Sequence, residues 1–275
     1  MVARLRPVTP LLAASVVCFT FAHSVFVSAG DKIPAELLVK DALASPPQTA
    51  VIEARLLPLA GRAKTAVVGA PLELVQDGRV LATATTNESG LATLRYNPTR
   101  KGNMPFTVRI AETSSLSASA AVTVAAWERR TPLLLVEMAS LADPSTGDPL
   151  ADAADELAKL TQFYYNVMYV TADISPQPDG FRASDRSRQW LATHKFPVGY
   201  VLVLPSTAEA LGAKLDELRS AGWTTIRIGI GRSKEFADTF LQRRLEAVMV
   251  PEPAKGHAPK KAKVAKDWKE VRKKL

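Results

Sequence analysis

The sequence has very few cysteines and histidines, with one cysteine and three histidines among its 275 residues. Cys18 and His23 fall within the first 29 residues, which have the composition of a leader. Beyond them the chain has no thiol, which excludes disulfides and cysteine metal sites. Only His194 and His257 remain, which excludes a histidine metal cluster. A Ser-His-Asp triad would have to use His194, which we interpret instead as a helix cap. No Walker-type loop occurs, and the tripeptide GIG is too short for a dinucleotide fingerprint.

The first 29 residues predict a secretory signal peptide. Arg4 and Arg6 give a basic start, the run from Leu11 to Val27 is mostly apolar, and small residues precede a cleavage site at Gly30. The alternative is a retained membrane anchor, since the run is just long enough to span a bilayer, although its serines and threonine weaken that interpretation. We therefore expect an exported protein, periplasmic or extracellular.

Net charge is distributed unevenly. The whole chain carries +8, of which the leader contributes +2 and residues 255–275 contribute +7, from nine Lys or Arg against two acids. Residues 30–254 therefore carry about −1. The high isoelectric point belongs to the C-terminal segment, which argues against a nucleic-acid-binding domain.

The segment 253–275 is expected to be a basic tail. Val264, Trp268, Val271 and Leu275 recur at spacings of four, three and four, which predicts an apolar stripe on a basic helix. Such a helix could lie on an anionic membrane surface, with Trp268 at the interface, or bind an acidic partner. The alternative is a disordered tail, because three isolated helical turns are marginal in water.

Residues 48–128 alternate apolar and polar residues in short segments separated by turns. This period predicts antiparallel strands, and therefore an all-β immunoglobulin-like sandwich. The preceding residues 30–47 lack a clear period and predict a spacer. The succession of a strand, a DG hairpin turn and a Thr-x-x-x-Gly turn resembles bacterial immunoglobulin-like and carboxypeptidase-regulatory-like modules, which implies spacing, display or binding. Those positions are Asp77, Gly78, Thr86 and Gly90.

Residues 131–252 change to apolar runs that alternate with helical stretches. The runs are PLLLVEM, NVMYVTA, GYVLVLP, TTIRIGI and EAVMVP. This alternation predicts a three-layer α/β domain with a parallel sheet and crossover helices. Ligands of such domains bind at the carboxyl ends of the strands.

This second domain resembles the haloacid-dehalogenase (HAD) superfamily, most closely its lipin-type phosphatidate-phosphatase branch. The shared features are a strand ending in Thr, a helix carrying Trp-Leu, and a Phe-Pro-x-Gly turn before the next strand. They stand at Thr171, Trp190, Leu191, Phe196, Pro197 and Gly199. The stretch IRIGIGRSKEFADTF also resembles the fourth motif of the family at its glycines. The resemblance implies an aspartate nucleophile, a second aspartate two residues later as acid and base, and acidic residues after the fourth strand that hold magnesium.

The catalytic positions of that family are changed in this chain. Glu137 stands at the first aspartate and Ala139 at the second. The extra methylene of glutamate moves the carboxylate by more than about 1 Å, which can cost roughly a hundredfold in rate. Alanine cannot transfer a proton, and Arg232 stands where an acidic residue is expected. Glu235 and Asp238 remain as candidate metal ligands, or as the exposed face of a helix.

Further candidates follow the neighbouring strands. Thr171 could bind phosphate or merely finish a turn. Lys214 is the nearest candidate for a phosphate-binding lysine, although it lies about a turn inside its helix. Asp143 or Asp148 would supply the nucleophile in an alternative register.

Arginines also follow the second and fourth strands of the α/β domain. Arg182, Arg186 and Arg188 follow the second strand and Arg232 follows the fourth. We take Arg182 and Arg232 as candidate anion-binding residues. The alternative for the first three is the solvated face of a helix that buries Trp190.

Together these features favour a non-catalytic binding or scaffolding role at the cell envelope, with no cofactor. The rival hypothesis is a divergent magnesium-dependent phosphatase acting on a phosphoester, such as a phospholipid. Glu137, Thr171 and Lys214 would then be catalytic, and Glu235 and Asp238 would bind the metal. In a third hypothesis the α/β domain is purely structural and the tail makes the functional contact.

Overall fold

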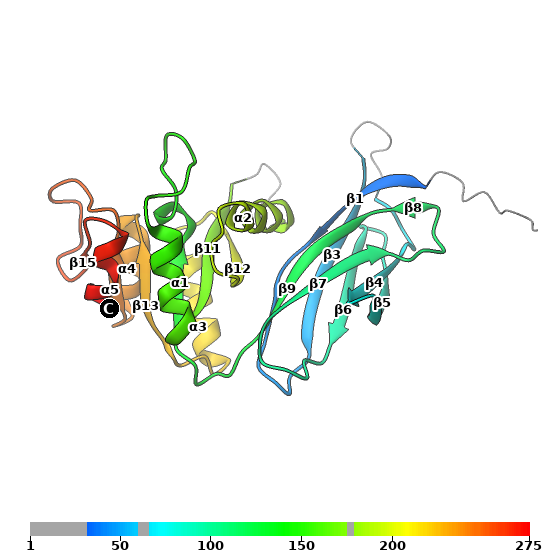
Figure 1. Ribbon diagram of the computed structural model, residues 1–275, viewed down its shortest axis with the longest axis horizontal. Helices are drawn as coiled ribbons and strands as arrows, with labels where there is room; N and C mark the ends of the chain where they lie inside the picture. The colour runs from blue at the N-terminus through cyan, green and yellow to red at the C-terminus, as the bar shows by residue number, and fades with distance from the viewer. Residues whose placement is uncertain (1–31, 60–65, 175–178) are drawn as a thin grey trace, which may run out of the picture. The chain divides into compact units, whose positions relative to one another are not determined.

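Two kinds of β-sheet structure follow one another along the chain in the computed structural model (Figure 1). The structure describes residues 32–59, 66–174 and 179–275. The expected signal peptide, and its alternative as a membrane anchor, lie outside the described residues.

The first domain is a β-sandwich, as the sequence predicts. Its sheets have the orders β6-β3-β1-β8 and β2-β9-β7-β4-β5, and most neighbouring strands are antiparallel. Alternate residues of one central strand, from Ala50 to Leu56, are fully buried between the sheets because successive side chains point to opposite faces. The strands are β1 (Ile33–Val39), β2 (Ala42–Ala44), β3 (Ala50–Pro58), β4 (Pro71–Gln76), β5 (Arg79–Thr85), β6 (Leu91–Tyr96), β7 (Gly102–Ile110), β8 (Leu116–Ser117) and β9 (Ser119–Ala126).

The prediction that residues 30–47 form a spacer is wrong for most of that segment. Within it, β1 pairs with β3 and β2 pairs with β9. Leu37 and Val39 are buried in the sandwich core. A three-residue strand such as β2 is too short to show a period in the sequence. β1 ends only a few residues before β2, so no long turn separates the two strands in the sequence.

The second domain is built on a six-stranded parallel sheet, which confirms the predicted α/β class. Its order is β12-β11-β10-β13-β14-β15, with every pairing parallel. The strands are β10 (Leu133–Glu137), β11 (Asn166–Asp173), β12 (Tyr200–Pro205), β13 (Ile226–Gly231), β14 (Glu246–Met249) and β15 (Lys263–Val264). The helices are η1 (Met138–Ser140), α1 (Ala153–Phe163), α2 (Phe181–Thr193), α3 (Ala210–Ser220), α4 (Lys234–Gln242) and α5 (Trp268–Lys274).

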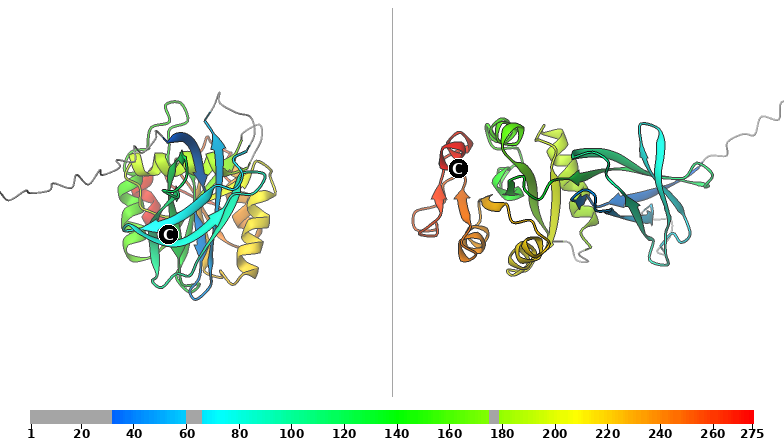
Figure 2. Two further views of the ribbon diagram at one scale, coloured as in Figure 1. Left: turned by 90° about the vertical axis from the view of Figure 1, so that its right-hand side faces the viewer. Right: turned by 90° about the horizontal axis from the view of Figure 1, so that it is seen from below.

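Helices cover both faces of this sheet. Figure 2 shows α1 and α5 on one side and α3 and α4 on the other. Leu134 and Val136 of β10 share a core with Leu157 of α1, whereas Leu135 shares a core with Leu215 of α3. A strand that is buried on both faces needs a continuous apolar run, which is why the sequence LLLV carries no alternation.

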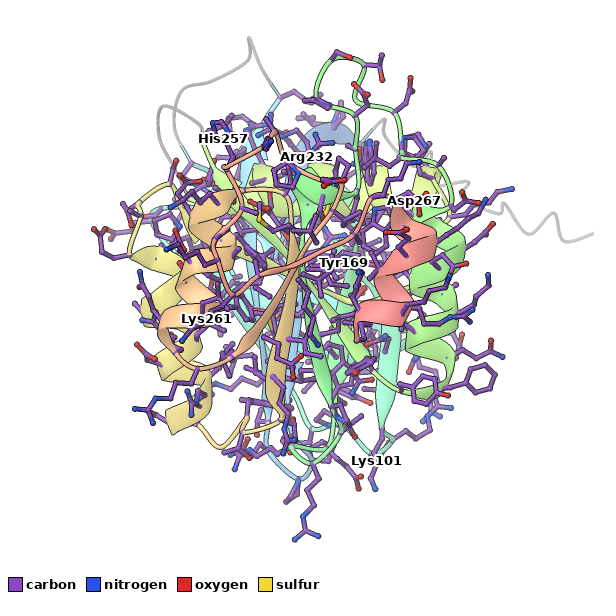
Figure 3. All side chains as sticks on the ribbon, turned by 90° about the vertical axis from the view of Figure 1, so that its left-hand side faces the viewer. Lys101, Tyr169, Arg232, His257, Lys261 and Asp267 are labelled. Carbon is purple, nitrogen blue, oxygen red and sulfur yellow. The ribbon has the colours of Figure 1, made fainter. Side chains whose placement is uncertain are left out.

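The C-terminal segment is part of this domain and not a separate tail. β15 pairs with β14, and α5 packs beside α1. Trp268 is 1% exposed and Val271 is fully buried. The prediction that Trp268 lies at a membrane interface is therefore wrong, because the apolar stripe faces the core. Figure 3 views the side of the domain on which this segment lies, with Lys261 and Asp267 marking its course.

Candidate functional site at the carboxyl edge of the parallel sheet

The strand order of the sheet reverses between β10 and β13. From β10 the chain proceeds outward through β11 and β12, and then returns to β13 on the other side of β10. In open parallel sheets, ligands bind in the crevice outside the carboxyl ends of the strands at such a reversal. Glu137 ends β10 and Arg232 directly follows β13. The sequence thus correctly places these two candidates on the strands that flank the reversal.

Glu137 is held by the start of α4. Its Oε2 accepts hydrogen bonds from the backbone N–H groups of Arg232 and Ser233, at 2.6 and 2.9 Å. Its Oε1 accepts a hydrogen bond from the Ser233 hydroxyl at 2.5 Å. That hydroxyl in turn accepts from the N–H of Phe236 at 3.2 Å and so caps α4. The N-terminus of a helix is a natural anion site, and here the anion is a side chain of the protein itself.

The glycine before Arg232 is required by this arrangement. A Cβ atom at Gly231 would lie 2.4 Å from a ring carbon of Phe236 and 2.8 Å from Oε2 of Glu137. Neither can withdraw freely, because the ring is buried and the carboxylate is hydrogen-bonded. The glycine that resembles a family motif thus permits close packing of Glu137 against α4.

A tryptophan of the C-terminal segment, Trp268, holds the turn that follows β10 through a hydrogen bond. The Ser140 hydroxyl donates to the carbonyl of Glu137 at 2.7 Å, and Ser140 is fully buried. The indole Nε1–H of Trp268 donates to the Ser140 carbonyl at 2.9 Å. Trp268 therefore anchors the backbone next to Glu137, a role that the sequence does not reveal.

Thr171 and Glu137 lie on opposite faces of the sheet. Glu137 pairs in register with Val170 on β11, one residue before Thr171. Val170 packs in the core under α3 and α4, so the alternation of side chains directs Thr171 toward the layer of α1 and α2. Thr171 is partly exposed. The structure therefore does not bring these two candidate catalytic residues onto one face.

The other candidate residues of the phosphatase hypothesis lie on α3 and α4. Lys214 is in the second turn of α3, where its ammonium pairs with Glu217 at 2.7 Å. Asp238 pairs with Lys234 at 2.7 Å within α4, and Glu235 is exposed on the same helix. Glu235 and Asp238 line a shallow groove between α3 and α4. Both carboxylates thus have the surroundings of an exposed helix face.

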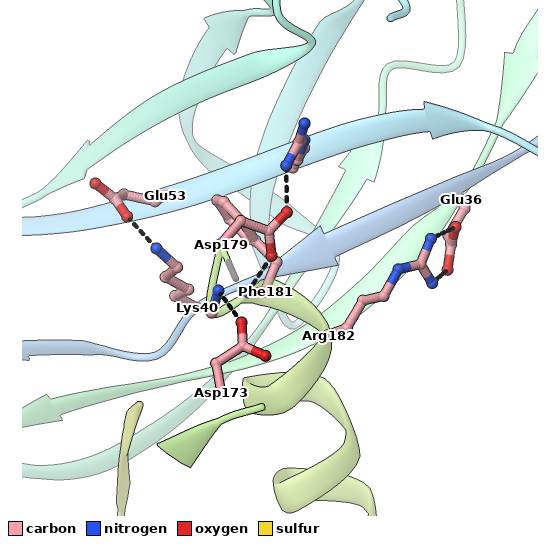
Figure 4. A network of polar contacts seen from close by, with 9 residues as sticks. Glu36, Lys40, Glu53, Asp173, Asp179, Phe181 and Arg182 are labelled. Carbon is pink, nitrogen blue, oxygen red and sulfur yellow. Dashed lines mark hydrogen bonds and ion pairs between the residues drawn. The ribbon is translucent and has the colours of Figure 1, made fainter. Parts of the chain in front are cut away.

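Arg182 contacts the sandwich. In the first turn of α2, its guanidinium makes two hydrogen bonds to the Glu36 carboxylate of β1, at 2.5 and 2.7 Å. The hydrogen-bonded carboxylate raises the pKa of Arg182 above its ordinary value. In the same network, shown in Figure 4, Asp179 pairs with Arg55 of β3. An external anion at Arg182 would have to displace Glu36.

Arg232 faces the loop of residues 141–150. The pKa of Asp143 in this loop is lowered, chiefly because the hydroxyl and the N–H of Ser145 donate to it at 2.5 and 2.8 Å. The positive charge of Arg232 makes a smaller contribution in the same direction. Asp148 is exposed, and its carbonyl accepts from the N–H of Asp143. The two alternative nucleophiles thus belong to a loop that closes on itself.

The described residues do not fit the magnesium ion that the HAD resemblance implies. Among them, no group of three or more His, Cys, Asp or Glu residues is placed to hold a metal ion. The carboxylate of Glu137 accepts three hydrogen bonds from Arg232 and Ser233, and Asp238 is paired with a lysine. Arg232 directly follows β13, where the resemblance implies an acidic ligand.

A second candidate site was not predicted from the sequence. Asp41, between β1 and β2, has a fully buried side chain that accepts from the N–H groups of Thr123 in β9 and Val201 in β12, at 3.0 and 3.1 Å. Arg188 of α2 pairs with it at 2.6 Å. Burial raises the pKa of Asp41, while Arg188 and the two N–H groups act in the opposite direction. Asp41 thereby fastens the sandwich to the edge strand β12.

A cleft of about 1350 Å³ lies next to this junction. It is lined by β2, by β12 and by one face of α3. Ser184 of α2 borders the cleft, and its buried hydroxyl has no hydrogen-bond partner among the described residues. The mixed lining could hold a ligand by non-covalent contacts. Residues this far apart in the chain give no local signal in the sequence.

No protein-family model and no curated protein matches the chain. Solved structures with some similarity include the N-terminal Ig1-2 module of the Drosophila receptor protein tyrosine phosphatase DLAR, at 16% identity and a TM-score of 0.27. That match covers 38% of this chain and 61% of the module. The human B7-H4 IgV-like domain matches at 11% identity and a TM-score of 0.25, over 34% of this chain and 98% of that domain.

A third similar structure is the cell-surface chitinase ChiW from Paenibacillus sp., at 12% identity and a TM-score of 0.24. The match covers 86% of this chain and 22% of the chitinase. TM-scores this low carry no inference about function. Within the described residues, no helix is long and apolar enough to span a bilayer.

Proposed function

We propose that this chain is an exported, non-catalytic protein that binds or scaffolds at the cell envelope, with an immunoglobulin-like sandwich joined to a HAD-like α/β domain. The observation that carries the proposal is the carboxylate of Glu137. Both of its oxygens accept hydrogen bonds from Arg232 and Ser233, so it holds the turn that leads into α4, whose N-cap is Ser233. These three hydrogen bonds hold the carboxylate against the turn before α4, which supports a structural role for it.

The other roles that phosphoryl transfer requires, proton transfer and phosphate binding, also lack a suitably placed residue. Ala139, two residues after Glu137, has no group that could transfer a proton. Thr171 lies on the other face of the sheet, and Lys214 is paired with Glu217. Each of these features removes a different requirement of the reaction, and together they support a non-catalytic domain.

The residues that resemble the HAD family have structural contacts instead. The hydroxyl of Tyr169 on β11 donates to the carbonyl of Pro197 in the Phe-Pro-x-Gly turn at 2.7 Å. The rings of Trp190 and Phe196 stack with centroids 5.2 Å apart. A fold retained without its catalytic groups would keep such contacts, which supports the HAD-like assignment.

The junction offers a place for the binding role. Asp41 and Arg188 hold the sandwich against β12, and the cleft beside them is lined from both domains. A ligand or partner segment bound there would contact the sandwich and the α/β domain at once. Binding of this kind needs no nucleophile and no metal.

The rival phosphatase hypothesis is tested by assaying the purified chain with p-nitrophenyl phosphate and with phosphatidate in the presence of magnesium. We expect no hydrolysis above that of the Glu137→Ala and Thr171→Val variants. Hydrolysis by the wild-type chain that both substitutions abolish would overturn the non-catalytic proposal. Because Glu137 also stabilises the fold, Thr171→Val shows whether a loss of activity reflects chemistry or unfolding.

A further inference from the structure

The C-terminal segment exposes a strongly basic surface although its apolar stripe is buried. Lys263, Lys269 and Arg272 pair with acidic side chains elsewhere in the domain. Five further lysines are exposed and form no ion pair within the described residues. They are Lys255, Lys260, Lys261, Lys266 and Lys273. Figure 3 shows the side of the domain that carries this segment.

Two aromatic side chains are exposed at the end of α1. Phe163 is 69% exposed and Tyr164 is 64% exposed. Their rings lie edge to face, with centroids 6.2 Å apart. Two large apolar side chains exposed side by side make this end of α1 a candidate contact surface.

The aromatic pair and the basic helix meet at one end of the domain. α5 runs alongside α1 in the same direction, because Lys269 pairs with Asp152 and Arg272 lies 4.0 Å from Glu156. Continuing this register, the C-terminal end of α5 flanks the last turns of α1. Leu275 follows directly on α5, as Tyr165 follows on α1, and both pack against the core on this face of the sheet.

We infer that this end of the α/β domain, formed by the exposed Phe163, Tyr164 and Lys273 and the partly exposed Lys274, docks on an anionic lipid surface. Aromatic rings are favoured at the membrane interface, and lysines beside them are attracted to anionic headgroups. The inference rests on the proposed binding role at the envelope. It replaces the buried Trp268 with Phe163 and Tyr164 as the interfacial residues.

An anionic membrane fits this surface better than a nucleic acid. Proteins that bind single-stranded nucleic acids combine stacking rings with a basic groove that follows the backbone. Neither Phe163 nor Tyr164 lines the cleft or the groove described above. A planar headgroup layer can contact the rings and the lysines together. The attraction between exposed charges is screened by salt, so binding should weaken as ionic strength rises.

The test is sedimentation of the full chain with vesicles of phosphatidylcholine alone and with added phosphatidylglycerol. We expect binding only when phosphatidylglycerol is present, with loss at high salt. The Lys273→Gln/Lys274→Gln variant should bind roughly tenfold or more weakly, since each basic residue near such a surface contributes about fivefold. Phe163→Ser/Tyr164→Ser should also weaken binding at constant charge.

The matched control is Arg79→Gln/Arg100→Gln, which removes two exposed positive charges from the sandwich. All variants carry the same first 31 residues, so any binding by that segment cancels in the comparison. Equal binding of the wild-type chain and the Lys273→Gln/Lys274→Gln variant to phosphatidylglycerol vesicles, or an equal loss in the control, would overturn the inference. Binding of a nucleic acid duplex in place of vesicles would do the same. The non-catalytic proposal would stand in either case, because it depends on the phosphatase assay.

Discussion

The carboxylate of Glu137 illustrates how one side chain can exchange a catalytic position for a structural one. It accepts three hydrogen bonds from Arg232 and Ser233, which directly precede α4, and Gly231 lacks the Cβ that would press against it. A carboxylate at a helix N-terminus is stabilised by the two N–H groups that it accepts from and by the helix dipole. Its loss should therefore affect folding before it affects any reaction.

Replacing Glu137 with alanine should lower the free energy of unfolding by about 1–3 kcal/mol, because the donors at the start of α4 lose their acceptor. Urea denaturation followed by circular dichroism measures this. The matched control is Glu88→Ala, since Glu88 is exposed and has no partner among the described residues. Its effect should stay within about 0.5 kcal/mol. Equal small effects of both substitutions would show that Glu137 is not a cap.

The sequence predicts the candidate site only in part. It places Glu137 and Arg232 correctly at strand ends, because buried apolar runs such as LLLV show where strands stop. It does not show where a side chain points, so the contact between Glu137 and α4 is visible only in the structure. Asp41 and Arg188 are 147 residues apart, and no local pattern relates them.

At the scale of elements, α5 shows what the periodicity of apolar residues can predict about a helix and what it cannot. The spacing of Val264, Trp268, Val271 and Leu275 predicts one helix, but the structure has a helix only over Trp268–Lys274, with Trp268 and Val271 on its buried face. Val264 lies in β15 instead. Periodicity reports that a face is apolar, but it does not identify what covers the face. Here the cover is α1 and the turn after β10.

Trp268→Ala should destabilise the chain by about 3–5 kcal/mol, because it empties a buried site and removes the donor to Ser140. Thermal unfolding and urea denaturation both measure this. Lys261→Ala, an exposed position in the same segment, serves as the control and should have little effect. A Trp268→Ala variant as stable as the control would restore the interpretation of the segment as a separate tail.

At the scale of the whole molecule, the buried Asp41 joins the two domains. Because burial raises its pKa in the folded chain, the folded state retains the proton at pH values where the unfolded chain, with a pKa of about 3.9, has lost it. The carboxyl therefore stabilises the folded state fully below that pH and progressively less as the pH rises through the folded pKa.

Asp41→Asn cannot titrate and isolates this effect. The free energy of unfolding of wild type should fall relative to the variant as the pH rises from about 3 to about 6. Urea denaturation of both proteins across that range measures the difference. A change in favour of wild type with rising pH would mean that Arg188 and the two N–H groups outweigh burial.

The most direct test of the non-catalytic domain is a calorimetric titration of the purified chain with Mg²⁺, beside the Glu137→Ala variant. We predict no saturable binding for either protein up to about 10 mM, because a hard cation needs free oxygen ligands and those of Glu137 are engaged by α4. Saturable binding by the wild-type chain that disappears in the variant would contradict the structural role of Glu137. It would favour the phosphatase in its place.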